Sequence, residues 1–590
     1  MAQSLKIPYG IADFQALVEE GYFYQDRTDR IPLIETAGKQ LLFLRPRRFG
    51  KSLLLSMLEN YYDLNKAEQF ESLFGHLAIG RHPTPLHNRY FVLKWDFSII
   101  AAQGGIQDIE RRIHEHINDR ITDFILRYET HFTHSIPLNS DNALSSFSAI
   151  LTAVKQTPYQ LYLLIDEYDN FANEVMMAGK EQYRALLQGE GLLKTVFKNI
   201  KSAAAGFGLD RVFITGVSPI VMSDMTSGYN VAINSYLEPE FNTLCGFTET
   251  EVSALLAQVS VNQQTHVAAL ELMRTFYNGY RFAPDVDVSL YNPTLSLYFI
   301  RALQRQNRYP DNLLDENLAM DRNKLKYIAQ LPHGRELLLE ALSNDNRIEI
   351  TQLSERFGIE DMLYAVKDRT FMASLLYYFG ILTLNGVTGF SEYILSIPNL
   401  VARKLYVERL RDDLLTDYEA RQITQAAAKT FCQTGDIQPL CEFIEQHYFK
   451  VLSNRDYRWV NELMLKIMFM TLLYNDHVYM MVSELETGRR YVDLSLIVRP
   501  DKREYQALDL VLEFKLVKLS ELAMTAEQVK AMSLEAMSAL PPVAERLQEG
   551  LQQAQHYVDE LRQQYPQAQL HGVAVVAIGF ERIVFQRLPR

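Results

Sequence analysis

The sequence predicts an α/β fold in three parts: a mostly parallel sheet covered by helices, a helical segment, and a second α/β region. Up to about residue 263, short apolar runs alternate with long amphipathic stretches such as 106–128 and 181–205, the pattern of strands joined by crossover helices. The middle is almost entirely helical, and the end reads helix, three strands, helix and strand. We therefore expect domains at 1–263, 264–450 and 451–590.

The composition of the chain narrows the classes of protein to which it can belong. The chain has 590 residues, of which 48% are hydrophobic, so several cores can form. Its net charge of −13 argues against a general DNA-coating protein, because phosphate affinity comes from clustered Lys and Arg. Three cysteines without CxxC spacing predict neither a zinc site nor a disulfide framework. The N-terminus lacks a signal-peptide pattern and no stretch has the length of a membrane span, so we expect a cytoplasmic protein.

The most informative motif is RPRRFGKS, residues 45–52, which lies between an apolar run and a helix-prone stretch. Its second half matches a phosphate-binding loop, in which backbone N–H groups wrap phosphate oxygens, Lys51 reaches the outer phosphates and Ser52 holds Mg²⁺. Arg45 stands where the common pattern has its first glycine. A basic turn before a core helix is the alternative interpretation. The candidate nucleotide-binding residues of the loop are Arg48, Phe49, Gly50, Lys51 and Ser52, and the expected cofactors are ATP and Mg²⁺.

A second acidic motif follows the apolar run at 161–165. Asp166 and Glu167 end that predicted strand, where Asp166 would hold Mg²⁺ and Glu167 would polarise the attacking water. A buried strand that simply emerges at two carboxylates is the alternative. A third predicted strand, 211–216, leads to Ser218, a candidate sensor of the γ-phosphate, although Thr215 and Ser218 are equally explained as turn formers.

Several stretches, in this order, resemble the AAA-ATPase-like family that bacteria often carry joined to a PD-(D/E)XK nuclease-like C-terminal domain: RPRRFGKSLLLSMLENYY, LLIDEYDN, FITGVSPI, LCGFTETEV, FYNGYRF and LYNPTLS. The resemblance covers most of the first three hundred residues and, more loosely, the last hundred and forty. It implies an AAA-like ATPase core, a helical lid and connector, and a restriction-endonuclease-like α/β domain. The family also has RPRRFGK at the loop, and the missing glycine leaves tight binding with slow turnover as an alternative to hydrolysis. Arg281 is a candidate sensor arginine, with a surface role as the alternative.

The last segment carries a second set of candidate residues. Asp493 lies in one predicted strand, and Glu513 and Lys515 end the next, two residues apart and therefore on the same face. In the resembled nucleases the two carboxylates bind Mg²⁺ and the lysine positions or activates water. A salt bridge on an ordinary edge strand is the alternative interpretation. Additional candidates are Glu462, Glu484 and Gln553.

The spacing of two residues between His114 and His116 argues against a zinc site on this helix. His114 and His116 lie on different faces of a predicted helix, whereas zinc sites on helices need a spacing of three or four.

The expected function is an ATP-binding AAA-like ATPase coupled to a Mg²⁺-dependent nuclease domain, with nucleotide state regulating access or assembly. The alternative is a nucleotide-switched regulatory protein whose nuclease-like domain binds but does not cleave, and a narrower option is an ATPase with a purely structural C-terminal domain. The expected partners are ATP and nucleic acid, DNA before RNA, with a homo-oligomer as a further expectation and no membrane.

Overall fold

The computed structural model describes residues 5–589 apart from 101–105, 171–191, 220–231, 261, 314–321, 344–345, 356, 358–366, 415–417, 450–460, 483–485 and 488–489. The chain forms two units. Unit 1 contains Met1–Val261, Asn278–Arg305 and Glu349–Leu395, and unit 2 contains Asn262–Tyr277, Gln306–Ile348 and Ser396–Arg590. The predicted central segment, 264–450, thus contributes to both units.

Unit 1 is built on a five-stranded parallel sheet with the order β2-β3-β4-β1-β5. The strands are β1 (Gln40–Leu44), β2 (Tyr90–Asp96), β3 (Gln160–Asp166), β4 (Leu209–Gly216) and β5 (Ile233–Asn234). The prediction of an α/β fold with a mostly parallel sheet is confirmed. Since both faces of such a sheet are covered, its inner strands read as continuous apolar runs, as β3 does with six buried residues after its first.

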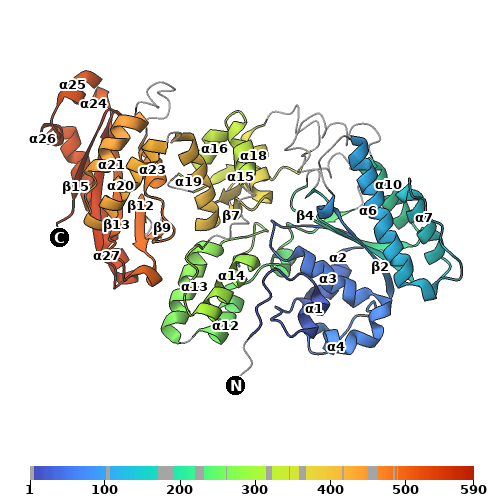
Figure 1. Ribbon diagram of the computed structural model, residues 1–590. Helices are drawn as coiled ribbons and strands as arrows, with labels where there is room; N and C mark the ends of the chain where they lie inside the picture. Colours follow the sequence, from blue (N-terminus) through green and yellow to red (C-terminus); the bar gives the residue numbers. More distant parts are fainter. Residues whose placement is uncertain are drawn as a thin grey trace. The chain divides into compact units, whose positions relative to one another are not determined.

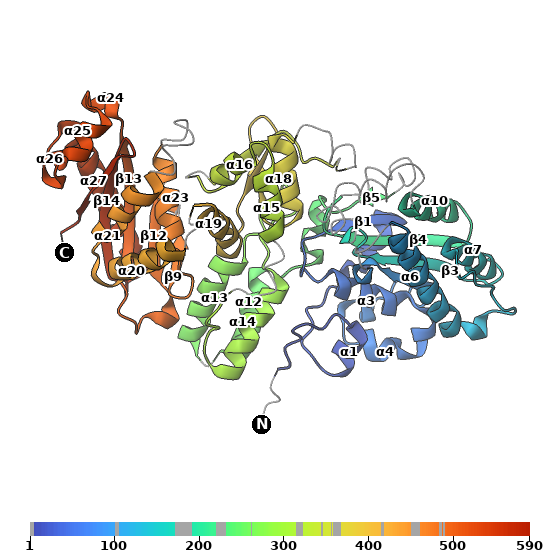
Figure 2. The same cartoon turned by 45° about the horizontal axis from the view of Figure 1, so that its top comes forward.

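The strand order positions the site. β4 lies between β1 and β3, so the loop that follows β1 and the acidic residues that end β3 meet at the carboxyl edge of the sheet. Helix α3 (Lys51–Tyr62) begins in that loop. Figure 2 shows α3 and α10 (Leu192–Ala204) on opposite sides of the sheet.

The other α-helices in the described part of unit 1 are drawn in Figure 1. They are α1 (Phe14–Glu19), α2 (Ile31–Ala37), α4 (Phe70–Phe74), α5 (Ala78–Arg81), α6 (Ile106–Arg127), α7 (Ala143–Val154), α12 (Glu249–Val259), α14 (Pro293–Gln306) and α18 (Arg369–Tyr378). A small sheet has the order β6-β8-β7, with β6 at Ile348–Ile350, β7 at Thr383–Val387 and β8 at Tyr393–Ser396. β7 and β8 are neighbours in this sheet, within a segment whose sequence predicts almost only helices.

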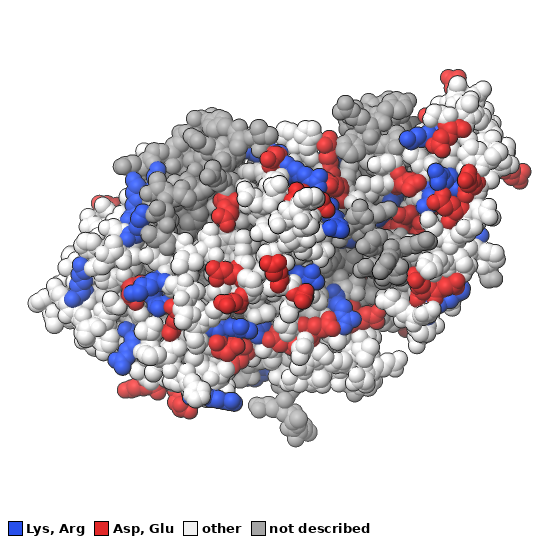
Figure 3. Space-filling model, turned by 180° about the vertical axis from the view of Figure 1, so that it is seen from behind, with Lys and Arg blue, Asp and Glu red and all other residues white. Residues whose placement is uncertain are grey.

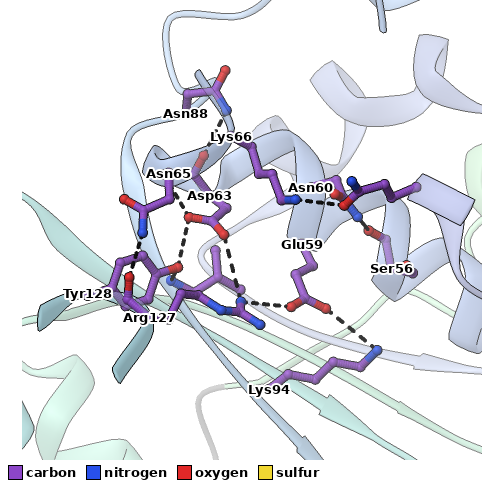
Figure 4. A network of polar contacts seen from close by, with 12 residues as sticks. Ser56, Glu59, Asn60, Asp63, Asn65, Lys66, Asn88, Lys94, Arg127 and Tyr128 are labelled. Carbon is purple, nitrogen blue, oxygen red and sulfur yellow. Dashed lines mark hydrogen bonds and ion pairs between the residues drawn. The ribbon is translucent and has the colours of Figure 1, made fainter. Parts of the chain in front are cut away.

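The far end of α3 is held by a polar network that Figure 4 shows from close by. Asp63, directly after the helix, accepts hydrogen bonds from the Tyr128 hydroxyl at 2.9 Å and from the Asn65 amide at 2.9 Å. Arg127 at the end of α6 donates to Glu59 at 2.9 Å and lies 3.7 Å from Asp63. Because buried polar groups need partners, this network fixes the helix whose first residue is Lys51.

Two histidines on α6 serve as hydrogen-bond acceptors. His114 Nδ1 accepts from the Ala143 amide at 3.1 Å, and His116 Nε2 accepts from the Asp96 amide at 3.3 Å. Both ring nitrogens must be unprotonated to accept, and burial lowers the pKa of both histidines below the ordinary 6.5. They therefore join α6 to α7 and β2 in the neutral form.

Unit 1 is accordingly expected to lose stability as the pH falls below about 6.5. In that range the two histidines are protonated in the unfolded chain, whereas their lowered pKa values keep them neutral in the folded protein. The urea unfolding midpoint should fall between pH 7.5 and pH 5.5, and the fall should be smaller in the variant His114→Asn/His116→Gln. His134→Asn, at an exposed position, is the matched control. An identical pH dependence in wild type and double variant would contradict this role.

Unit 2 contains a mixed five-stranded sheet with the order β15-β14-β13-β12-β9. β13 and β14 are parallel, and the other neighbouring pairs are antiparallel. The strands are β9 (Tyr479–Val482), β12 (Leu494–Val498), β13 (Asp509–Val517), β14 (Leu570–Ile578) and β15 (Arg582–Arg587), with a separate pair of β10 (Glu486–Thr487) and β11 (Arg490–Tyr491).

The helices of unit 2 are α13 (Gln263–Tyr277), α15 (Arg322–Gln330), α16 (Gly334–Ala341), α19 (Leu400–Leu414), α20 (Tyr418–Thr434), α21 (Gln438–Phe443), α23 (Glu462–Leu473), α24 (Leu519–Leu522), α25 (Ala526–Ala531), α26 (Leu534–Ser538) and α27 (Pro541–Gln564). α27 packs on β13 and β14, where an ideal Cβ at Gly550 would lie 2.9 Å from the Ala574 Cβ and 3.8 Å from the Lys515 Cγ. On the other face, the rings of Phe469 and Phe514 lie 5.1 Å apart. Among the described helices, none combines the length and the apolar character that crossing a lipid bilayer requires.

Candidate functional site

The loop between β1 and α3 turns sharply into the helix. Arg48 has φ 69° and Gly50 has φ 93°, both in the left-handed region. No heavy atom lies within 4 Å of an ideal Cβ at Gly50, so the backbone there is open to a ligand. Because the first N–H groups of a helix lack partners within the helix, the start of α3 provides donors for an anion.

Lys51 lies inside the loop. Its side chain is buried, and its ammonium donates to the carbonyl oxygens of Arg45 at 2.9 Å and Pro46 at 3.1 Å. Burial lowers the pKa of Lys51, while the carboxylates of Glu167 and Asp166 oppose that shift. The loop, the lysine and the acidic strand end therefore lie close together.

A cavity of about 290 Å³ opens beside this loop. Arg48, Lys51, Ser52 and Glu167 line its polar side. Its other walls are residues 8–12, 23–25, 244–247 and 293–297, which include Tyr9, Phe23, Tyr24 and Phe247. A cavity whose lining combines charged groups with aromatic rings suits a ligand that has an anionic part and a planar part.

Two arginines shape this cavity. The Nη1 atom of Arg48 is buried without a hydrogen-bond partner in the described part of the chain. Arg27 forms a two-pronged ion pair with Glu251, with Nη2 at 2.8 Å from Oε2, and Nη2 also donates to the Gly246 carbonyl at 2.8 Å. The orphaned donor of Arg48 therefore marks the place where an anion would be bound, and the Arg27 pair holds two walls together.

The acidic residues at the end of β3 differ in environment. Asp166 is buried and accepts a hydrogen bond from the Thr215 hydroxyl at 2.6 Å. Glu167 lines the cavity and has φ 47°, an uncommon backbone conformation for a residue with a side chain. Burial raises the pKa of Glu167, the Lys51 charge lowers it and Asp166 raises it further. Glu167 is thus a carboxylate with raised basicity that faces the cavity.

The two candidate sensor hydroxyls have different partners. Ser218 is fully buried and donates to Asp169 at 2.8 Å, while Asp169 also accepts from the amides of Val217 and Ser218. Thr215 is the hydroxyl in contact with Asp166. Asp169 was not expected from the sequence, although it lies in the quoted run LLIDEYDN, and it fixes the turn after β4.

Two other candidates differ in their position relative to the cavity. Phe49 lines it and lies edge-on to Tyr280 at 4.9 Å and to Phe282 at 5.2 Å. Arg281 is not among the residues that line the cavity, and its guanidinium donates to Asn385 on β7 at 3.1 Å.

Arg45 points away from the cavity and into the core. Its guanidinium is 1% exposed and donates to the carbonyls of Leu44, Tyr236 and Phe241 at 2.8, 3.0 and 2.7 Å. It lies over the rings of Phe43 and Phe282, at 4.4 and 4.2 Å from their centroids. Burial lowers the pKa of Arg45 to about 10, which leaves it charged at neutral pH. The residue that replaces the common glycine thus anchors the loop.

In unit 2, Asp493, Glu513 and Lys515 come together where β12 begins, beside the middle of β13. The Asp493 amide donates to Glu513 Oε1 at 3.3 Å, and Asp493 Oδ2 accepts from the Phe514 amide at 2.9 Å. Lys515 Nζ lies 4.0 Å from Glu513 Oε2, and all three side chains are buried. Burial and the Asp493 carboxylate raise the pKa of Glu513 to about 9, while Lys515 opposes that shift.

The additional candidates differ in position. Glu462, at the start of α23, accepts from the Leu516 amide at 3.2 Å. Burial raises the pKa of Glu462 and the Lys515 charge opposes it, so this carboxylate is an electrostatic neighbour of the trio. Gln553 lies on α27, three residues after Gly550, and Glu484 lies outside the described residues. Among the described residues, no group of three His, Cys, Asp or Glu side chains is arranged to hold a metal ion.

Comparisons with known proteins cover parts of the chain. An uncharacterized protein in the vnfD 5′ region of Azotobacter chroococcum mcd 1 is 28% identical over 301 residues, 49% of this chain and 50% of that protein. The chain thus spans about half the length of this curated relative.

Two solved structures from Aeropyrum pernix also overlap with the chain. The ORC1 protein in complex with DNA has a TM-score of 0.25 and 11% identity, covering 68% of this chain and 94% of that one. The ORC2 protein with ADPNP and ADP has a TM-score of 0.31 and 10% identity, covering 70% and 96%. Overlaps this loose support no functional argument.

Residues 8–226 match the model of the AAA-ATPase-like family, described as a predicted AAA-ATPase. This match spans β1, the loop with Lys51, α3, and the strand that ends at Asp166. The segment 8–226 is thus identified as AAA-ATPase-like.

Proposed function

We propose that this protein is an ATP-hydrolysing AAA-type ATPase joined to a Mg²⁺-dependent nuclease domain that cleaves phosphodiester bonds of nucleic acid. The observation that carries the nuclease half is the convergence of Asp493, Glu513 and Lys515 at the start of β12 in a mixed sheet, in a chain that also has a phosphate-binding loop. Nucleotide state would regulate access to the second site or assembly of the protein.

The residues around the 290 Å³ cavity fit ATP. Lys51 would exchange its two carbonyl partners for phosphate oxygens, and Arg48 would use its orphaned Nη1 in the same way. Ser52 and Asp166 supply the oxygen ligands that Mg²⁺ prefers. Glu167, with its raised basicity, would orient and deprotonate the attacking water.

Glu167→Gln is expected to keep ATP affinity within about twofold and to lower the hydrolysis rate about 100-fold, the lower end of what a general base contributes. Nucleotide binding by calorimetry and phosphate release measure the two effects separately. Glu19→Gln, at an exposed position, is the matched control. Unchanged phosphate release in Glu167→Gln would remove this residue from the hydrolytic step.

The second site fits a divalent cation by its donor set. Asp493 and Glu513 bring two buried carboxyl groups together, and the raised pKa of Glu513 means that its negative charge is disfavoured there unless a cation compensates it. Mg²⁺ bound there would neutralise the charge that develops on the scissile phosphate. Lys515 would hold the attacking water beside the carboxylates, and Phe514 fixes the strand from the other face.

Nucleic acid is the proposed substrate, and DNA is proposed before RNA. Acidic and basic side chains alternate over the face drawn in Figure 3, and neither sign covers a broad area there. Such a surface supports local engagement of a strand at the cleavage site better than general coating of a duplex.

A nucleotide-switched protein that binds without cleaving is the second candidate. One observation favours it: among the described residues, no three His, Cys, Asp or Glu side chains form a group that could hold a metal ion, and the trio itself offers only two carboxylates.

Cleavage assays test the proposal. Plasmid, single-stranded DNA and RNA are incubated with Mg²⁺ or Mn²⁺, with and without ATP, for wild type and Lys51→Ala, with Lys39→Ala as the matched control at an exposed lysine. We expect cleavage by wild type and an altered ATP response in Lys51→Ala only. Absence of cleavage under every condition, with ATP binding lost in Lys51→Ala, would favour the second candidate.

A further inference from the structure

Unit 2 contains a second cavity, of about 820 Å³, that belongs to neither site described above. It is enclosed by α19, α20, the end of α23 and residues 505–507. This segment precedes β13, which begins at Asp509, and Lys515 lies six residues further along that strand. At about 3.3 Å per residue, the two sites are roughly 20 Å apart along the strand. The volume falls within the range of small-molecule sites.

The wall of this cavity is positively charged in an acidic chain. Four cations line it, Lys404, Arg411, Arg421 and Lys429, against two carboxylates, Glu408 and Asp476, a net charge of +2. Lys404 and Asp476 neutralise each other at 2.7 Å. Arg421 pairs with Asp412 at 3.2 Å, which leaves Arg411 and Lys429 beside the single carboxylate of Glu408, so the remaining field of the wall favours an anion.

Arg411 is the central donor of this wall. Across the part of the chain that the structure describes, its guanidinium has no hydrogen-bond or ion-pair partner, although it is half-buried. Burial raises the pKa of the nearby Tyr474 phenol, and the Arg411 charge acts against that rise, so the cation and the phenol are electrostatic neighbours. A guanidinium with five unused N–H donors at a concave wall fits a phosphate.

The same wall carries groups suited to a base or sugar. Tyr505 is 56% exposed and lines the cavity next to Gln506. Gln425 and Gln433 on α20 add amide donors and acceptors. An exposed tyrosine ring beside amides can stack on a base and hydrogen-bond its edge.

We propose that this cavity binds a nucleotide, with its phosphate at Arg411 and Lys429 and its base on Tyr505. The site is separate from the phosphate-binding loop and from the Asp493, Glu513 and Lys515 trio. It therefore does not depend on either half of the proposed function.

Calorimetry on the full chain carrying Lys51→Ala tests the proposal, in EDTA so that no probe is cleaved. The probes are inorganic pyrophosphate and the 5′-phosphorylated dinucleotide pUpU. We expect both to bind and pUpU to bind about tenfold more tightly, because only pUpU has bases to stack. Absence of binding by both probes at 2 mM would overturn the proposal.

Three further variants assign the site. Arg411→Gln/Lys429→Gln is expected to weaken both probes at least tenfold, whereas Arg562→Gln, an exposed arginine on α27, should change neither. Tyr505→Ala, a change at an exposed position that does not threaten folding, should remove the preference for pUpU over pyrophosphate. Affinities that are unchanged in Arg411→Gln/Lys429→Gln would overturn the proposal.

Discussion

Replacing Arg45 with glycine, the residue common at this point of phosphate-binding loops, is expected to destabilise unit 1 by about 4 kcal/mol. The substitution would leave the carbonyls of Leu44, Tyr236 and Phe241 buried without their donor. It would also open a cavity between the rings of Phe43 and Phe282. Matching the common motif would therefore weaken the fold that carries it.

Urea unfolding at pH 7.5 measures this loss. Arg45→Lys is expected to lose roughly half as much, because an ammonium replaces the charge but not the planar fork of donors. Arg111→Ala, which removes surface ion pairs with Asp108 and Glu115, is the matched control and should cost less than about 1 kcal/mol. A loss below about 1 kcal/mol in Arg45→Gly would show that the buried carbonyls find other partners.

The elements next to the motifs were predictable because their signals are local. An apolar run followed by Gly50, Lys51 and Ser52 predicts a strand, a turn and a helix, and the structure has β1 and α3 there. In unit 2, the period of two residues correctly puts Glu513 and Lys515 on one face and Phe514 on the other.

The buried position of the Arg45 side chain was not predictable from the residues next to it in the sequence. Its partners Tyr236 and Phe241 lie 191 and 196 residues further along the chain, and only the strand order brings them to the loop. The same holds for the Arg27–Glu251 pair, which joins residues 224 positions apart. Pairs at such separation leave no pattern in a single sequence, since periodicity reports only which face of an element is buried.

The choice between the two candidate sensor hydroxyls shows a subtler limit. Thr215 and Ser218 lie three residues apart at the end of β4, and either fits a strand end that faces the loop. Which one meets Asp166 depends on the turn that follows, and that turn is fixed by Asp169, which takes the amides of Val217 and Ser218. Turn geometry set by a side chain from the turn after another strand is a tertiary effect that local propensity does not encode.

Lys515→Ala is expected to lower cleavage roughly 1,000-fold, within the range for a group that positions or activates water. Lys515 is buried, and its ammonium lies 4.0 Å from Glu513. In Lys515→Ala, a cation from the solvent would not take up the same fixed position. ATP binding should be unchanged, because the phosphate-binding loop belongs to unit 1. Initial cleavage rates with Mg²⁺ and calorimetry with ATP measure the two expectations in the same preparation.

Lys518→Ala is the matched control. Lys518 lies three residues after Lys515 and is exposed, so this variant should cleave at the wild-type rate. Lys515→Arg keeps the charge beside Glu513 but spreads it over a planar group, and is expected to remain at least tenfold below wild type. A role in folding alone would lower the unfolding midpoint of Lys515→Ala in step with its rate. Cleavage that survives in both Lys515→Ala and Asp493→Asn would show that this site does not catalyse cleavage. Lys515→Ala removes the positive charge, and Asp493→Asn removes the anionic metal ligand, that the proposed chemistry requires.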